Sequence, residues 1–96
     1  MIKLETIDID NKEAEGVSVN TEHTFIFVIK AKKGFLACGY FDINVANKVG
    51  DTAAIVTGVK TFDDMLNANV VKVSEKANEL GIKEGMKGKR ALKLMF

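Results

Sequence analysis

The chain has 96 residues, the size of one small domain, and its 14 basic and 13 acidic residues leave a formal net charge of +1. Apolar residues make up 47 % and charged residues 28 %, which excludes a disordered, collagen-like or fibrous chain. One cysteine excludes an intrachain disulfide, and the sequence contains neither the apolar core of a signal peptide nor a membrane-spanning stretch, so we expect a single soluble, cytoplasmic domain over residues 1–96.

The N-terminal residues are predicted to begin with a strand. Apolar and polar side chains alternate in part over residues 2–9, which is typical of a half-buried strand. The alternation breaks between Leu4 and Ile7, and we interpret the break as a bulge or a slip. Residues 11–16 are polar and indicate a turn or loop, and residues 17–19 indicate a short strand fragment.

Two apolar runs follow and predict a β-hairpin. They cover residues 25–29 and 35–41, and a short turn with two lysines and Gly34 separates them. Because neither run alternates cleanly, we expect both strands to be central in the sheet and covered on both faces.

From Asp42 the apolar spacing becomes helical. Asp42 is a good N-cap, Ile43, Ala46 and Val49 share one face, and Gly50 is a typical C-terminal stop. The rest of the chain predicts short elements: a strand at 52–59, a helix beginning at Thr61, a strand at 70–73, a helix at 75–80 capped by Ser74, and a helix at 89–96. The expected fold is α+β, a single mixed sheet of N-terminal antiparallel strands plus a β-α-β crossover, with helices packed on it.

The predicted crossover places a candidate site at one edge of the sheet. The connection that contains helix 42–49 is long enough to join two parallel strands, so the ends of strands 35–41 and 52–59 should meet at one edge, together with two helix N-termini. We predict a small-ligand or anion pocket at that edge, formed by Gly39, Tyr40, Asp42, Gly58, Lys60 and Thr61. The alternative is structural, in that the glycines relieve crowding and Lys60 is solvated.

Other chemistry has less support, and whether the protein is an enzyme stays open. Cys38 is the sole thiol and His23 the sole imidazole, so Cys38 is a weak candidate nucleophile that more often would be a small buried apolar residue. Two such residues are too few for a zinc site, so no metal is expected. The sequence has no nucleotide-binding glycine motif, so no cofactor is expected.

The near-neutral total hides a polarised charge. Residues 1–22 hold six acidic side chains against two lysines, and residues 83–96 hold five basic side chains against one glutamate. The second hypothesis is therefore a non-catalytic interaction module that forms a homo-oligomer through these unlike charges, with Lys87, Lys89 and Arg90 as the partner surface. A solvated helix face is the alternative for these side chains. Nucleic acid is a weaker hypothesis because no aromatic residue interleaves with the basic ones.

Several blocks of the sequence resemble one known family. These blocks are 33–40, 46–56, 58–66, 80–82, 85–88 and 91–92. They are similar to the YunC family, small proteins assigned to domain of unknown function 1805, over about residues 31–92. The resemblance implies a compact α+β fold and no established activity. The chain departs from the family pattern at residues 20–24, where relatives carry proline, and at Arg90, where relatives often carry an acid.

Overall fold

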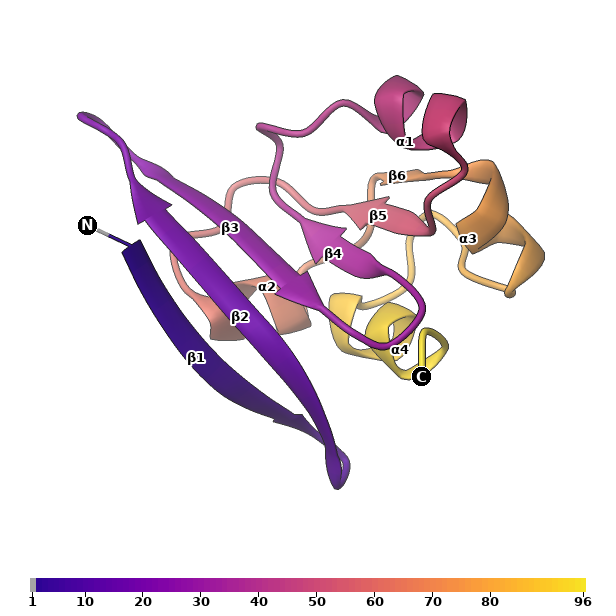
Figure 1. The fold of residues 1–96 in the computed structure, drawn as a ribbon, viewed down its shortest axis with the longest axis horizontal. Coiled ribbons are helices and arrows are strands. Elements are labelled where there is room, and N and C mark those ends of the chain that lie inside the picture. Colours follow the sequence, from indigo (N-terminus) through magenta and orange to yellow (C-terminus); the bar gives the residue numbers. More distant parts are fainter. Residues whose placement is uncertain (1) are drawn as a thin grey trace.

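The computed structural model describes residues 2–96. Within this range six strands form one mixed sheet, in the order β1-β2-β3-β4-β5-β6, and four helices pack against it (Figure 1). The strands are β1 (Ile2–Ile9), β2 (Lys12–Asn20), β3 (Phe25–Lys30), β4 (Phe35–Ala37), β5 (Ala53–Ile55) and β6 (Lys72–Val73). The helices are α1 (Ile43–Val49), α2 (Phe62–Asn67), α3 (Glu75–Glu79) and α4 (Gly88–Lys93). The α+β prediction with a mixed sheet is confirmed.

The strands β1 and β2 form a long regular hairpin, which corrects the predicted bulge and loop. They pair residue by residue from Ile2↔Val19 to Ile9↔Lys12, without interruption. The turn consists of Asp10 and Asn11 alone, at φ values of 51° and 72° that suit a two-residue hairpin. The predicted loop at 11–16 is therefore wrong, because small and polar side chains hid the β2 pattern.

The break in alternation that predicted a bulge has a different cause. Side chains at even positions of β1 point to one face of the sheet and those at odd positions to the other. Ile2 and Leu4 lie on one face and are 70 % and 76 % exposed, whereas Ile7 and Ile9 lie on the opposite face and are buried. The apolar side of β1 thus changes face partway along an unbroken strand.

The predicted hairpin and crossover are both present. β3 pairs with β4 antiparallel, β4 pairs with β5 parallel, and α1 lies in the connection between β4 and β5. Asp42 caps α1 by accepting a hydrogen bond from the Asn44 backbone N–H at 2.9 Å, and Gly50 ends it in the left-handed conformation. Both parallel strands are only three residues long, shorter than the predicted runs.

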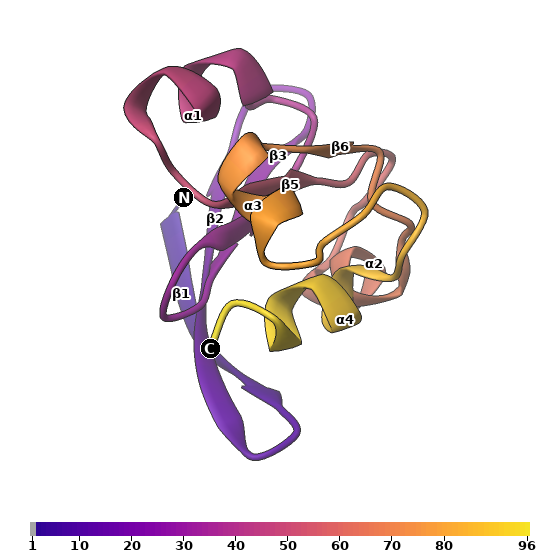
Figure 2. The ribbon, with the colours of Figure 1, turned by 90° about the vertical axis from the view of Figure 1, so that its right-hand side faces the viewer.

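The helices are divided between the two faces of the sheet. α2 and α4 cover what we call the inner face, and α1 covers the outer face only over β4 and β5; Figure 2 shows α1 on one side of β5 and α2 and α4 on the other. Phe27 and Ile29 of β3 are buried on the inner face, but Ile26 and Val28 on the outer face are only partly buried. Coverage on both faces is thus correct for β4 and wrong for β3.

The C-terminal helices complete the core beneath the inner face. α4 presents a fully buried apolar stripe of Ala91 and Leu92, which Met95 continues beyond the helix end. Ile82 donates its backbone N–H to the Ala77 carbonyl at 3.1 Å beyond the end of α3, where Gly81 adopts a φ of 91°. None of the helices in residues 2–96 combines the length and apolar character needed to cross a membrane.

Candidate ligand-binding cleft

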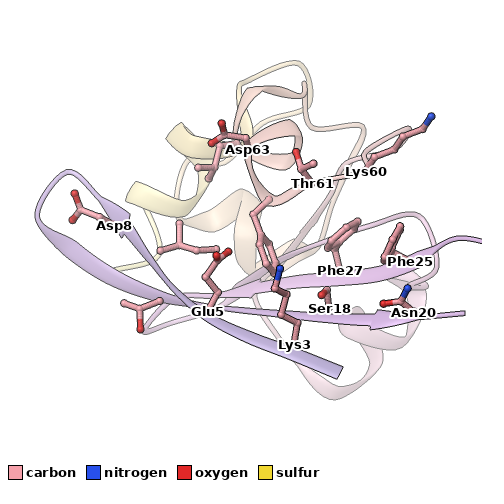
Figure 3. Close-up of a pocket in the computed structure, with 14 residues that line it drawn as sticks. Lys3, Glu5, Asp8, Ser18, Asn20, Phe25, Phe27, Lys60, Thr61 and Asp63 are labelled. Atoms are coloured by element: carbon pink, nitrogen blue, oxygen red, sulfur yellow. The ribbon is translucent and has the colours of Figure 1, made fainter. Parts of the chain in front are cut away.

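A cleft of about 740 Å³ opens on the inner face, between the sheet and the start of α2. Figure 3 shows strands β1 to β3 along its floor and the segment around Lys60 to Asp63 along its opposite wall. Its lining residues are Lys3, Glu5, Thr6, Ile7, Asp8, Ser18, Asn20, Phe25, Phe27, Lys60, Thr61, Phe62, Asp63 and Leu66.

The cleft ends where α2 touches the sheet, at Gly16. A Cβ built on Gly16 would lie 2.6 Å from Ile7 Cδ1 and 2.9 Å from Phe62 Cε1, too close for any real side chain. The absence of a side chain at this position therefore lets the Phe62 ring approach the β2 backbone. Toward the start of β1, beyond that contact, the inner face carries the exposed side chains of Lys3 and Glu5, which line the cleft.

Three aromatic rings form a continuous apolar row through the cleft. Phe25 and Phe27 stack with their centroids 5.5 Å apart and an interplanar angle of 25°. Phe27 then meets Phe62 edge to face, with centroids 5.4 Å apart. Phe27 is buried between its neighbours, so the ring surface open to a planar ligand belongs to Phe25, which is 38 % exposed, and to the partly exposed Phe62.

Polar groups lie beside the aromatic row. Ser18 is 5 % exposed as a residue, and its hydroxyl makes no hydrogen bond within residues 2–96. Since no buried side-chain polar atom in this range lacks a partner, the Ser18 hydroxyl reaches solvent. Lys3 and Glu5 rise from β1 toward α2, and Lys60 points outward at the end near Phe25 (Figure 3). Within the described residues neither Lys3 nor Glu5 forms an ion pair. The cleft therefore presents an accessible hydroxyl and charges of both signs to a ligand.

The start of α2 satisfies its own hydrogen bonds. Thr61 Oγ1 accepts from the Asp64 N–H at 3.0 Å, and Asp64 Oδ2 accepts from the Lys60 N–H at 3.0 Å. α2 has six residues and α1 seven, and each N-cap is occupied by a side chain of the chain itself. Both helix starts are thus capped from within the chain, and the lysine side chains that line the cleft are Lys3 and Lys60.

The structure brings together four of the six residues predicted at the crossover edge. Gly39, Tyr40, Gly58 and Lys60 line a side hollow of about 280 Å³, with Thr24, Phe25, Cys38 and Val59. Phe25 and Lys60 line both spaces, so the hollow lies next to the cleft.

The remaining two predicted residues lie elsewhere. Thr61 faces the main cleft, and Asp42 borders a separate hollow beneath α1. Gly58 has a φ of 70°, which accounts for glycine there on backbone grounds. A Cβ at Gly39 would meet only Thr57 Cγ2, at 3.3 Å, a tight contact that a small shift of the threonine methyl group would relieve.

The weak nucleophile candidate, Cys38, lies in a structural environment. It is buried, and its Sγ accepts a hydrogen bond from the Phe27 N–H at 3.3 Å. His23 lies in the turn before β3 with its side chain 87 % exposed, beside Glu22. Over residues 2–96 no three His, Cys, Asp or Glu side chains are grouped so that they could hold a metal ion.

Twelve of the fourteen cleft residues were not among the predicted site residues, and five of these twelve are Lys3, Glu5, Ser18, Asn20 and Phe25. All five lie on β1 to β3, and register pairs such as Lys3↔Ser18 and Ser18↔Phe27 bring them together. The available signal was the polar alternation of residues 16, 18 and 20, which marks the inner positions of β2.

Part of the polarised charge is paired within the chain. Asp10, at the tip of the β1–β2 hairpin, accepts hydrogen bonds from Lys93 and from Lys89, the latter at 3.3 Å. Lys87 donates to the Asn67 carbonyl at 3.0 Å. Two of the three basic residues predicted as a partner surface thus have partners within the chain, and Arg90 stays exposed.

The Asp10 pairing predicts a pH effect on stability. Hydrogen bonds from Lys93, then Lys89, hold the pKa of Asp10 below its ordinary value of 3.8. A carboxyl with a lowered pKa stabilises the fold above its unfolded pKa, and that contribution disappears as the pH falls through the folded value. We expect Asp10→Asn to be less stable than the wild type near neutral pH and equal to it in strong acid, as measured by urea unfolding. Glu13→Gln, on the same hairpin, is the control and should show a smaller difference; an equal loss would contradict the pairing.

The fold and cleft define a small α+β protein with one mixed sheet and an aromatic cleft on its inner face. Residues 37–95 match the family described as "Domain of unknown function (DUF1805)". The chain is 32 % identical to the "Uncharacterized protein YunC" of Bacillus subtilis (strain 168), across all of this chain and 99 % of that protein. The chain therefore belongs to the DUF1805 family, and YunC is one of its relatives. A solved structure, the "Protein of Unknown Function TA1206" from Thermoplasma acidophilum, superimposes with a TM-score of 0.95 at 35 % identity, covering all of this chain and 94 % of that one.

Proposed function

We propose that this protein binds a small planar organic molecule carrying an acidic group, in the cleft between β1–β3 and α2. The observation that carries the proposal is the aromatic row Phe25–Phe27–Phe62 beside the Ser18 hydroxyl, which reaches solvent and makes no hydrogen bond within residues 2–96. The volume of about 740 Å³ lies within the range of roughly 300–1,000 Å³ usual for ligand sites.

The charges around the row support an acidic, mixed-polarity ligand. Lys60 lies where the cleft meets the side hollow, beside Phe25, so a ligand stacked on Phe25 would bring an anionic group within its reach. Glu5 and Asp63 are acceptors for hydroxyl or amino groups elsewhere on the ligand. This retains the small-ligand hypothesis but moves its centre from the crossover edge to the inner face of β1–β3.

The proposal is tested with a panel of inorganic phosphate, nucleoside monophosphates and aromatic carboxylic acids. At about ten times its Kd, a bound ligand should raise the free energy of unfolding by about 1.4 kcal/mol and Tm by roughly 6–11 °C. Amide NMR shifts on titration should map to β2, β3 and the start of α2. Ser18→Ala and Lys60→Ala should each weaken the affinity by about threefold to tenfold, since each removes one hydrogen-bonding group.

The matched control is Lys48→Ala, which removes an exposed lysine from the last turn of α1, away from the cleft. It should leave the affinity unchanged. A panel without any response, or shifts confined to the outer face, would contradict the proposal.

A further inference from the structure

The outer face of β1, β2 and β3 carries an ordered apolar array. Cross-strand register places Ile2, Val19 and Ile26 in one row and Leu4, Val17 and Val28 in the next. These six side chains, which we call the outer array, are on the side of the sheet opposite the cleft. Ile2 and Leu4 belong to the outer array because the apolar side of β1 changes face, which also leaves Lys3 and Glu5 on the inner side.

No helix in residues 2–96 covers the outer array. α1 lies on the same face but contacts β5, beside the array and not over it. Ile2 and Leu4 are 70 % and 76 % exposed, and the other four side chains of the array are partly buried. Val45 and Val49 of α1, which line the hollow beneath that helix, are 57 % and 65 % exposed. A sheet face left to water normally carries polar side chains, and a contiguous apolar face of this kind marks an interaction surface.

A charged row borders the array. The next register row contains Thr6, Glu15 and Lys30, with Glu15 directly opposite Lys30 on the neighbouring strand. Neither charge is in an ion pair within the described part of the chain; Lys30 Nζ donates to the Ala31 carbonyl at 3.0 Å. The row thus offers one acid and one base, side by side, at the edge of an apolar surface.

We propose that a second copy of this chain covers the outer array, so that the protein is a dimer in which two outer faces pack together. A two-fold axis parallel to the strands, between β2 and β3, would place β2 and β3 of one array opposite β3 and β2 of the other, and Glu15 opposite Lys30 of the partner subunit. The Ile2 and Leu4 side chains of β1 would then face the partner's sheet beside its α1. This surface is self-complementary in both apolarity and charge, which is the requirement for an isologous interface. The resulting arrangement is a sandwich of two sheets about 10 Å apart.

The area that a dimer needs extends beyond the outer array. A standard interface buries roughly 800 Å² per partner, so the outer array would have to be joined by the charged row and by the exposed side chains of α1 to form one. α1 stands above the sheet at one border, where its exposed valines would meet the edge of the partner's β1. This interface differs from the charge-polarised surface at Lys87, Lys89 and Arg90, and it is independent of ligand binding in the cleft.

Light scattering after size exclusion tests the oligomeric state. The wild type should elute with the mass of a dimer. Leu4→Lys, at a position already exposed in the protomer, should raise the dissociation constant at least tenfold without lowering far-UV helix and strand signals. Val71→Lys replaces an exposed apolar residue, 42 % accessible, that lies outside the array beside β6, and it should remain dimeric.

A mixing experiment tests the orientation. In Glu15→Lys the proposed geometry places lysines opposite one another, and in Lys30→Glu it places glutamates opposite one another, so each variant alone should dissociate severalfold more readily at low salt. Mixing the two variants restores opposite charges at both contacts, and the heterodimer should regain the wild-type affinity. A folding defect cannot be rescued by mixing, so recovery reports on the interface itself.

Three outcomes would overturn the proposal. One is a wild-type protein that remains monomeric at high concentration. A monomer that binds lipid vesicles through the outer array would count as the same outcome. Another is a dimer that Leu4→Lys leaves intact, which would place the interface elsewhere. The third is a failure of the mixed variants to associate better than each alone.

Discussion

Gly88→Ala is expected to lower the free energy of unfolding by about 3 kcal/mol, through overpacking at the contact between α4 and α2. A Cβ at Gly88 would overlap the Met65 carbonyl oxygen, and it would lie 2.9 Å from Leu36 Cδ2. The obstacle is backbone, which cannot turn aside as a side chain would. Both Met65 and Leu36 are fully buried, so the surrounding core has no free space into which to relax.

Thermal and urea unfolding measure the effect, and a loss of about 3 kcal/mol corresponds to a fall in Tm of roughly 12–24 °C. Gly39→Ala is the matched control, since its nearest contact would be the movable Thr57 Cγ2 at 3.3 Å, and it should cost less than about 1 kcal/mol. Equal losses for the two variants would show that general glycine replacement, and not the α2–α4 contact, is responsible.

The parts of the fold that could be predicted are those with local signals. Asp42, Thr61 and Ser74 begin helices as their side chains predicted, because each cap is a hydrogen bond to a neighbour two or three residues away. The parallel pairing of β4 with β5 also followed from connection length alone. These features depend on a few consecutive residues and need no knowledge of the rest of the chain.

The N-terminal hairpin could not be predicted in the same way. Its apolar side chains change from one face of the sheet to the other between Leu4 and Ile7. A prediction that expects all apolar side chains of a strand on one face therefore takes this regular strand for a bulged one. The reason for the change is tertiary, because α2 covers only part of the inner face. The same two residues mark the boundary between the cleft on one side and the outer array on the other. The break in alternation between Leu4 and Ile7 therefore reflected the two surfaces, the cleft and the outer array.

The candidate site was only partly predictable for a related reason. Lys60 and Thr61 were identified because they follow a predicted strand, and the structure places both in the cleft. Ser18 and Phe25 join them through strand pairing and through the Phe27–Phe62 contact, which links residues 35 positions apart. Contacts at that separation leave no periodic signal in a single sequence.

Ser74→Ala is expected to lower the free energy of unfolding by about 2–4 kcal/mol. The side chain is fully buried, and its hydroxyl makes three hydrogen bonds. It donates to the Asp51 carbonyl at 2.8 Å and accepts from the N–H groups of Ala53 at 2.9 Å and Ala77 at 3.2 Å. Alanine would remove a helix cap worth about 1 kcal/mol and leave buried partners unsatisfied at about 1–3 kcal/mol more.

The matched control is Thr61→Ala, which removes an exposed N-cap with one hydrogen bond to Asp64, and it should cost only about 1 kcal/mol. The excess loss in Ser74→Ala then measures the attachment of α3 to the start of β5. Amide hydrogen exchange should locate it, with protection falling at Ala53 and Ala77 and unchanged in the β1–β2 hairpin. If both variants lose equal stability, Ser74 is a helix cap alone and the sheet does not depend on it.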